Sequence, residues 1–426
     1  MASDDLPRVA CIVTVYFPRS HADVIVSKLL ADFTQPAPRN VERFDFSQQV
    51  RDLTQAPLPV DERGDLRRPR LRVVSLYVDQ TPANDISREW AAWAGVPIFP
   101  SIREALTLGG AELAVDGVLI IGEHGEYPTN ERGQKEYPRR RLFEDVVTVL
   151  RESGRGVPIF NDKHLGYAWS DAKWMYDAAR SLGAPLAAGS SISTTPVTWR
   201  DPPLELRLGT PLAGALAVGY GPLEAYGFHT LEVLQCMVER RAGGETGVAA
   251  VQALTGEAMW EAGAAGRWDE RLLAAALATE TPALVGDARD LAKRPAVFLV
   301  EYRDGLRAAV CMLDSVVRHW LFAARLAEAK EQEAGVVATR FRDHGQEPFG
   351  HFAYLVEEIQ DLVCSRREPH PVERTLLTTG ILDRVMESLA LGGVRLETPE
   401  LAISYRIQSS DTPPAAQAAL YDHQAP

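Results

Sequence analysis

The sequence predicts an α/β fold in which a Rossmann-like, doubly wound parallel sheet is followed by an α+β domain with a large open, mostly antiparallel sheet. Two observations lead to this fold class. The first half of the chain alternates short, continuously apolar runs with helical patterns, as expected when helices cover both faces of a parallel sheet. The second half mixes long helix patterns with strand-like runs and lacks that alternation.

Apolar runs define the candidate strands of the first sheet, and helix patterns between them imply right-handed βαβ crossovers. The runs lie at 8–15, 71–78, 95–99, 116–122, 156–161 and 184–191. One segment interrupts the alternation. Residues 34–70 are rich in proline, aspartate, arginine and glutamine without a sustained apolar period, and we interpret them as an inserted loop with one short helix.

The second half is predicted to contain helices and strands in mixed order. The helix patterns cover 222–240, 246–262, 269–278, 347–365 and 371–390. The strand-like runs cover 205–208, 214–218, 296–303, 306–313, 335–342 and 401–407, with a hairpin turn at Asp304-Gly305. The predicted domains are therefore 1–194 and 195–407, followed by a tail at 408–426.

Composition narrows the class of protein. The 426 residues carry a formal net charge of -13, which argues against nucleic acid and anionic membrane surfaces as partners. The four cysteines are widely separated and form no CxxC pair, which argues against a structural zinc site. Such scattered cysteines are typical of reduced thiols in a cytoplasmic protein. No secretory signal, GxSxG motif or P-loop is visible.

Polar residues follow the predicted strands of the first sheet where each strand ends. Ligands of open α/β sheets bind outside these carboxyl ends, so we expect the following side chains to meet at one crevice. They are Tyr16, Arg19 and His21 after the first strand, Glu123, His124, Tyr127 and Asn130 after the fourth, and Asp162, Lys163 and His164 after the fifth. The basic run 139–141 fits either a solvated helix start or an anion site.

These residue types suggest acid–base or metal chemistry on a small polar substrate. Catalytic roles are assigned to Lys163, His229, Glu123 and His124; Lys163 is suited to protonating a carbonyl or hydroxyl oxygen, and Glu232 lies on the helix face of His229. Tyr16, Arg19, Tyr127, Asn130 and Asp162 are the candidate substrate-binding residues. His21, Glu123, His124 and His164 are candidate ligands for a divalent metal such as Mn or Zn. Structural roles, such as a capping Asp162 or a core His229, are the alternatives.

The order of several segments resembles the Gfo/Idh/MocA oxidoreductase superfamily. These segments are "SIREAL" with "AVDGVLIIGEHGEY", "FNDKHLGYAWSDAKWMYDAARSLGAPLAAGSS", "GPLEAYGFHTLEVLQ" and "PHPVERTLLTTGILDRVMESLALGGVRLETP". The resemblance spans roughly 8–405. It implies a nucleotide-binding domain joined to an open-sheet domain, activity on sugars or polyols, Lys163 beside the reacting carbon and His229 as general base. It also implies a homodimer or homotetramer that buries the free face of the open sheet.

The chain departs from that family at the cofactor. The glycine fingerprint for pyrophosphate is replaced by residues 16–19, and Asp79, the candidate ribose ligand, is displaced by the insertion. We therefore predict an enzyme for a sugar-like or hydroxy-acid substrate that works by metal-assisted or acid/base hydrolysis, elimination or isomerisation rather than by ordinary NAD-dependent hydride transfer. The alternatives are an NAD(P)-dependent sugar or polyol oxidoreductase with an atypical phosphate loop, and a non-catalytic binding or scaffold subunit.

Overall fold

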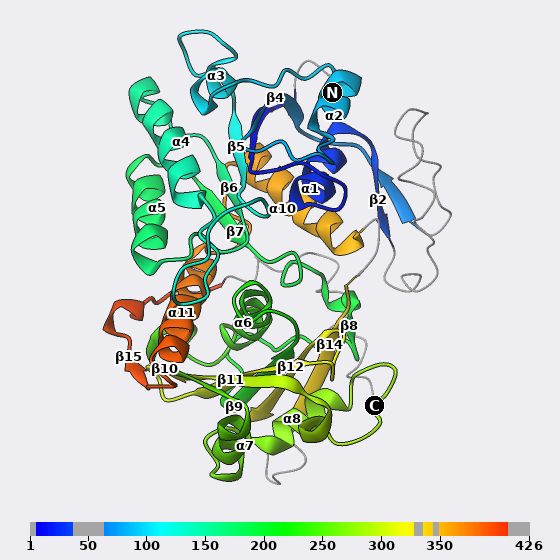
Figure 1. Cartoon of the computed structure of the whole chain (residues 1–426), viewed down its shortest axis with the longest axis vertical. Coiled ribbons are helices and arrows are strands. Elements are labelled where there is room, and N and C mark those ends of the chain that lie inside the picture. Colours follow the sequence, from blue (N-terminus) through cyan, green and yellow to red (C-terminus); the bar gives the residue numbers. More distant parts are fainter. Residues whose placement is uncertain (1–5, 37–63, 328–334, 344–348, 408–426) are drawn as a thin grey trace. The chain divides into compact units, whose positions relative to one another are not determined.

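The computed structural model of the chain describes residues 6–36, 64–327, 335–343 and 349–407 (Figure 1). The chain divides into two compact units, which are described separately. Unit 1 comprises residues 1–128, 136–194 and 343–372, and unit 2 comprises residues 129–135, 195–342 and 373–426. The predicted second domain, 195–407, is therefore wrong as one continuous run, because residues 343–372 belong to unit 1.

Unit 1 is built on a five-stranded parallel sheet with the order β4-β1-β5-β6-β7. The strands are β4 (Arg72–Val78), β1 (Arg8–Val13), β5 (Gly117–Ile121), β6 (Ile159–Asp162) and β7 (Leu186–Gly189). The predicted strand at 95–99 is only a parallel bridge between Leu76 and Ile98. That bridge places residue 98 beside β4, so the direction of winding reverses between β1 and β5.

Helices cover both faces of this sheet, as the doubly wound pattern requires (Figure 1). They are α1 (His21–Leu30), α2 (Ser87–Ala94), α3 (Ile102–Thr107), α4 (Arg139–Ser153), α5 (Trp169–Ser181) and α10 (Gly350–Ser365). Helix α10 returns to unit 1 from far along the sequence because its apolar face, including Leu355, Ile359 and Leu362, is buried in the same core as α1 and the sheet.

The predicted insertion begins and ends as a pair of strands. Strand β2 (Phe33–Pro36) pairs antiparallel with β3 (Gly64–Arg67), so the two ends of the insertion are held side by side. Residues 37–63, including the short helix predicted there, lie outside the described residues, as does the predicted tail at 408–426.

Unit 2 is built on an eight-stranded sheet with the order β15-β10-β11-β12-β9-β13-β14-β8. All neighbouring strands are antiparallel except β12 and β9. The strands are β8 (Arg200–Asp201), β9 (Leu212–Gly219), β10 (Val248–Thr255), β11 (Lys293–Tyr302), β12 (Arg307–Asp314), β13 (Trp320–Leu326), β14 (Val336–Phe341) and β15 (Leu396–Glu397). The hairpin between β11 and β12 turns at Gly305, as predicted.

Four parts of the second half differ from the sequence prediction. The predicted helix at 246–262 is wrong: β10 is followed by a turn at Gly256 (φ 60°) and α7 (Glu257–Ala264). The run at 205–208 forms no strand, and 401–407 contributes only a bridge at Tyr405. Strand β13 was not predicted. Pairing of β10 with β11 over most of its length stabilises the strand against its local helical preference.

Both faces of the unit 2 sheet are covered. Helices α6 (Ala225–Val238) and α11 (Glu373–Ala390) pack on one side, and α7 and α8 (Glu270–Leu277) pack on the other (Figure 1). The α7–α8 segment shares a hydrophobic core with the sheet. Its Trp260, Trp268 and Leu272 belong to the same buried cluster as Leu216 on β9 and Val297 on β11. A homo-oligomer was predicted from the sequence because an uncovered apolar sheet face was expected. The described part of unit 2 has no such face, and the oligomeric state stays a prediction.

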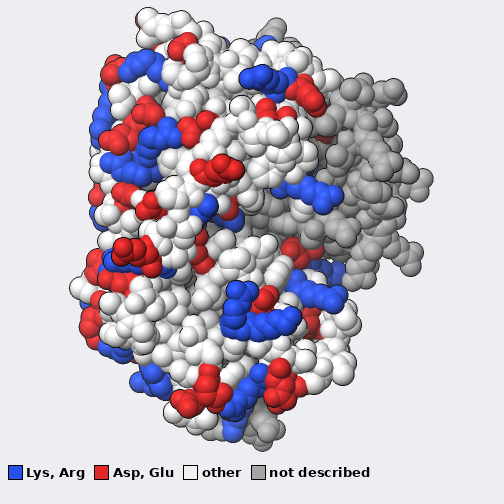
Figure 2. All heavy atoms as spheres, in the orientation of Figure 1, with Lys and Arg blue, Asp and Glu red and all other residues white. Residues whose placement is uncertain are grey.

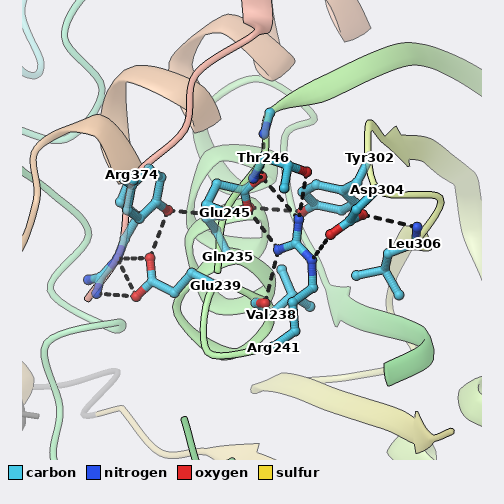
Figure 3. Close-up of polar contacts among 12 residues, drawn as sticks. Gln235, Val238, Glu239, Arg241, Glu245, Thr246, Tyr302, Asp304, Leu306 and Arg374 are labelled. Atoms are coloured by element: carbon cyan, nitrogen blue, oxygen red, sulfur yellow. Dashed lines mark hydrogen bonds and ion pairs between the residues drawn. The ribbon is translucent and has the colours of Figure 1, made fainter. Parts of the chain in front are cut away.

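A buried polar network holds α6, α11 and the end of the described chain together within unit 2 (Figure 3). Glu239, directly after α6, accepts hydrogen bonds from Arg374 on α11 and from the hydroxyl of Tyr405. On α6 itself, Gln235 donates a hydrogen bond to Glu245, whose carboxylate pairs with Arg241. The network satisfies charges that would otherwise be buried without partners.

The surface carries mixed charge. On the face shown in Figure 2, basic and acidic side chains are interspersed. Within the described residues, no helix has the length and apolar character needed to cross a membrane.

Candidate active site

The candidate site lies at the carboxyl edge of the unit 1 sheet, where β1, β5 and β6 end. The hydroxyl of Thr14 after β1 donates to the carbonyl oxygen of Glu123 after β5 at 2.7 Å, which ties two strand ends together. Arg19, His124 and Lys163 have positive φ angles of 70°, 66° and 60°. Such strained backbone in non-glycine residues concentrates at functional sites, and here it occurs after each of the three strands.

Glu123 is the centre of a buried ion-pair cluster. Its Oε1 lies 3.0 Å from Nζ of Lys163, and its Oε2 lies 2.5 Å from a guanidinium nitrogen of Arg139. Burial alone would raise the pKa of Glu123, but the positive charges of Lys163 and Arg139 outweigh it and hold the pKa well below its usual range. Gly122 makes the cluster possible, because a Cβ there would lie 2.7 Å from Cγ of Arg139.

Arg139 was missed as a site residue by the sequence analysis. It begins α4, has no exposed surface, and its other terminal nitrogen donates to Nε2 of His164 at 3.1 Å. Of the basic run 139–141, the first residue, Arg139, is therefore buried and is not part of a solvated helix start. The sequence signal was Gly122, since a glycine beside a functional glutamate leaves room for a large neighbouring side chain.

Lys163 directs its ammonium group into this cluster. The residue follows β6 directly, its side chain is 6% exposed, and its carbonyl oxygen accepts a hydrogen bond from the amide of Gly189 on β7. Glu123 is its acceptor within the described part of the chain, so further N–H donors of the ammonium remain for a ligand oxygen.

A second pair lies beside the first. Nδ1 of His21, the first residue of α1, lies 2.6 Å from Oδ2 of Asp162, the last residue of β6. The ring of His124 packs against that of His21 with centroids 5.4 Å apart. Burial, followed by the charge of His21, lowers the pKa of His124 to about 4, which keeps this imidazole uncharged near neutral pH.

The metal hypothesis gains no support from this geometry. Within the described ranges, no three side chains of the histidine, cysteine, aspartate or glutamate type are grouped so that they could hold an ion. Three of the predicted ligands are instead engaged elsewhere: Glu123 by two cations, His164 by Arg139, and His21 by Asp162.

The remaining predicted site residues have other surroundings. The side chain of Tyr16 is fully buried and its hydroxyl bonds to Ser27 on α1, so this geometry gives no support to its predicted substrate-binding role. Tyr127 donates its hydroxyl to Asp79 at 2.7 Å. Asn130 and His229 belong to unit 2, and the structure does not relate them to the unit 1 cluster.

His229 has its own surroundings in unit 2. It lies on α6 within an aromatic group, with its ring centroid 5.6 Å from Trp320 and 6.1 Å from Tyr226. Glu232, which was predicted to orient it, accepts hydrogen bonds from Thr375 and Thr378 on α11. Glu232 therefore joins α6 to α11, and its role beside His229 stays a prediction.

The β1–α1 turn does not fit the pyrophosphate of a dinucleotide. A Rossmann cradle needs free backbone amides at the helix N-terminus. Here Ser20 Oγ accepts from the amides of Phe17 and Asp23, and the carboxylate of Asp23 accepts from the amide of Arg19 at 2.8 Å. The helix start thus already holds a carboxylate of its own chain, where a phosphate would be repelled.

The candidate ribose ligand is also engaged. Asp79 follows β4 and accepts hydrogen bonds from the hydroxyls of Tyr77 and Tyr127 and from the guanidinium of Arg141. Burial would raise the pKa of Asp79, but the Tyr127 hydrogen bond and the Arg141 guanidinium lower it overall. The acidic residue stands at the expected end of the second strand, with its oxygens used by neighbouring side chains.

Comparison with solved structures finds chains with a similar fold. No family model and no curated protein matches the sequence. GenD2 from gentamicin A biosynthesis, solved in complex with NAD, is 14% identical with a TM-score of 0.54 over 92% of this chain and 96% of that chain. An oxidoreductase from Agrobacterium radiobacter, in complex with NAD+, L-tartaric acid and magnesium, is 13% identical with a TM-score of 0.51 over 92% and 98%.

A third structure, scyllo-inositol dehydrogenase from Lactobacillus casei, is 10% identical with a TM-score of 0.50 over 92% and 98% of the two chains. This chain therefore shares the fold of these solved structures, a Rossmann-like parallel sheet followed by a second, mostly antiparallel sheet, as the sequence predicted.

Proposed function

We propose that this chain is an enzyme of the oxidoreductase type that acts on a hydroxyl or carbonyl group of a small, sugar-like or hydroxy-acid substrate, with Lys163 as its acid/base group. The observation that carries the proposal is the buried Lys163–Glu123 pair at the carboxyl edge of β5 and β6. This edge is where open α/β sheets bind their ligands.

Lys163 is suited to this role by its surroundings. Glu123 orients the ammonium of Lys163. Because Arg139 binds the same carboxylate, the negative charge of Glu123 is shared between two cations. An ammonium held in this way donates to a substrate oxygen and stabilises negative charge that develops there. Asn161 adds a second polar group, since its Oδ1 is buried and lacks a hydrogen-bond partner within the described residues.

Two reactions are compatible with this acid/base group. The fold of GenD2 and of scyllo-inositol dehydrogenase favours oxidation or reduction of a polyhydroxylated substrate with NAD(P), which supplies hydride transfer when bound. The β1–α1 turn favours the second candidate, an acid/base reaction without nicotinamide, because Ser20 and Asp23 already accept from the amides of Phe17, Arg19 and Asp23 in this turn.

One experiment separates these candidates. Purified protein is titrated with NADH and NADPH by calorimetry, and a panel of inositols, aldoses, ketoses and 2-hydroxy acids is followed by NMR with and without NAD(P)+. Saturable dinucleotide binding with product formed only in the presence of NAD(P)+ supports the oxidoreductase. Product formed without any nicotinamide supports the second candidate.

The variant Lys163→Met tests the residue assignment in the same assay. Lys173→Met is the matched control, because Lys173 is an exposed lysine of unit 1 that pairs with Asp177 one turn along α5. Loss of turnover in both variants, or in neither, contradicts the assignment of Lys163. A protein that turns over no compound of the panel contradicts the proposed substrate class and favours a binding subunit.

A further inference from the structure

His21 and Asp162 have the geometry of a histidine–carboxylate dyad. The 2.6 Å contact joins Nδ1 of the imidazole to a carboxylate that is 1% exposed, while the imidazole itself is 14% exposed. A buried carboxylate of this kind fixes the proton on Nδ1 and directs the lone pair of Nε2 away from itself. Within the described residues, Nε2 of His21 has no hydrogen-bond partner.

The surrounding groups hold the ring in place without occupying Nε2. Phe352 on α10 contacts the His21 ring edge to face with centroids 5.0 Å apart, and His124 contacts it at 5.4 Å. Glu123, Lys163 and Arg139 are the other charged groups of the cluster, and His124 is uncharged near neutral pH. His21 is thus fixed on two sides while part of its side chain remains accessible.

The dyad adjoins the Lys163–Glu123 pair through the chain itself. Asp162 and Lys163 are consecutive at the end of β6, and Glu123 and His124 are consecutive after β5. One pair ends in an imidazole and the other in an ammonium. The base follows β1 and the acid follows β6, with β5 between them at the same edge of the sheet. A base and an acid are the two groups that a proton transfer at carbon requires.

We propose that His21 is a general base, positioned by Asp162, that removes the proton from the carbon next to a substrate carbonyl whose oxygen is bound by Lys163. The C–H bond breaks and its proton passes to Nε2, while its electron pair forms a carbon–carbon double bond. The carbonyl π electrons move to the oxygen, which takes a proton from Lys163, and the product is an enediol or enol. Return of both protons completes hydrogen exchange or isomerisation, and no oxidant or reductant is consumed.

This inference rests on the proposed function for the substrate oxygen at Lys163. It assigns catalysis to His21, the first residue of α1, where the resembled fold binds a dinucleotide. Asp162 is a positioning residue, because it acts through the imidazole and contacts no reacting atom in this scheme.

The first test needs no substrate. Histidine side chains of the full chain are labelled with 15N, and the His21 signals are identified by their loss in His21→Gln. At neutral pH we expect the tautomer with the proton on Nδ1, and Asp162→Asn should shift the tautomer balance or the Nδ1 proton. A proton on Nε2, or an imidazole fully charged at neutral pH, overturns the proposal.

The second test measures exchange at carbon. Hydroxyaldehydes and hydroxyketones of the panel are incubated in D2O without nicotinamide, and deuterium at the carbon next to the carbonyl is followed by NMR. We expect exchange by the wild type and about a 10²- to 10⁴-fold lower rate in His21→Gln, the range over which a general base contributes. Asp162→Asn should lower the rate with little change in KM.

A matched control exists in unit 2. Nδ1 of His319 lies 2.5 Å from Oε1 of Glu280, so His319→Gln removes a similar histidine–carboxylate bond and should leave exchange unchanged. Oxidation of a panel compound with NAD(P)+ but no exchange at carbon supports the proposed function and overturns the dyad's role as a carbon base. If His21 carries its proton on Nδ1 but the protein neither exchanges hydrogen at carbon nor turns over any panel compound, the role of His21 as a carbon base is overturned. The proposed function then fails as well.

Discussion

Lys163 and Glu123 form a 3.0 Å ion pair in which each side chain is 5–6% exposed, and Arg139 binds the opposite oxygen of the same carboxylate. Two cations therefore depend on one buried anion. This arrangement fixes the ends of β5 and β6 and the start of α4 relative to one another, and it accounts for the large side chain packed over Gly122.

Glu123→Gln should destabilise the protein strongly, because it leaves two buried cations without a compensating charge. We expect the free energy of unfolding to fall by about 3–5 kcal/mol, measured by urea denaturation. Glu144→Gln, which removes a carboxylate that is 55% exposed from the same helix as Arg139, should change it by no more than about 0.5 kcal/mol. Equal midpoints for the wild type and Glu123→Gln would contradict this interpretation of the cluster.

His124 should make stability depend on pH in a defined window. Its pKa falls from 6.5 to about 4 on folding, because burial and then the charge of His21 disfavour the imidazolium. Between these values the unfolded chain binds more protons than the folded one, so stability decreases as pH falls from 6.5 towards 4. His124→Gln should flatten this part of the curve of unfolding free energy against pH. A slope that is unchanged in the variant would contradict the assignment.

The fold class follows from the sequence because each strand of the five-stranded sheet of unit 1 lies in a mainly apolar run between helical patterns. The exceptions have long-range causes. Residues 248–255 have a local helical pattern, but antiparallel pairing with β11 makes them a strand. Helix α10 is recognisable as a helix, yet its membership of unit 1 depends on packing against α1, which no local pattern encodes.

The candidate site was predicted in part, for a similar reason. Glu123, Lys163 and His21 follow strand ends, and the carboxyl edge of a parallel sheet can be located from the order of elements. Arg139 was missed because a basic run before a helix is most often solvated. Tyr16 was misplaced because a residue directly after a strand can turn either to the ligand edge or into the core, and it packs into the core.

Asp23→Asn tests whether the start of α1 excludes phosphate through charge. Asparagine keeps the acceptor for the amide of Arg19 but removes the negative charge from the helix N-terminus. We expect NADH to bind about 5- to 30-fold more tightly in calorimetry, corresponding to about 1–2 kcal/mol. Asp32→Asn removes the same charge just beyond the other end of α1 and serves as control. Unchanged or weaker binding in Asp23→Asn would show that this carboxylate does not oppose the dinucleotide.

Arg374→Met tests the buried network of unit 2. The substitution removes the cation that pairs with the buried carboxylate of Glu239 and leaves the Tyr405 hydroxyl as its hydrogen-bond donor within the described residues. We therefore expect a loss of about 3–5 kcal/mol in the free energy of unfolding. Arg395→Met breaks an arginine–carboxylate pair with Glu301 that is more than a third exposed, and it should cost no more than about 1 kcal/mol. Similar losses in the two variants would mean that burial does not set the strength of the Glu239 pair.

The most direct test of the account is the turnover number of Lys163→Met measured beside Lys173→Met on the substrate identified from the panel. We predict that Lys163→Met lowers kcat by about 10²- to 10⁴-fold while remaining folded by circular dichroism, and that Lys173→Met retains the wild-type kcat. A folded Lys163→Met variant with wild-type kcat would contradict the placement of the active site at the carboxyl edge of the unit 1 sheet.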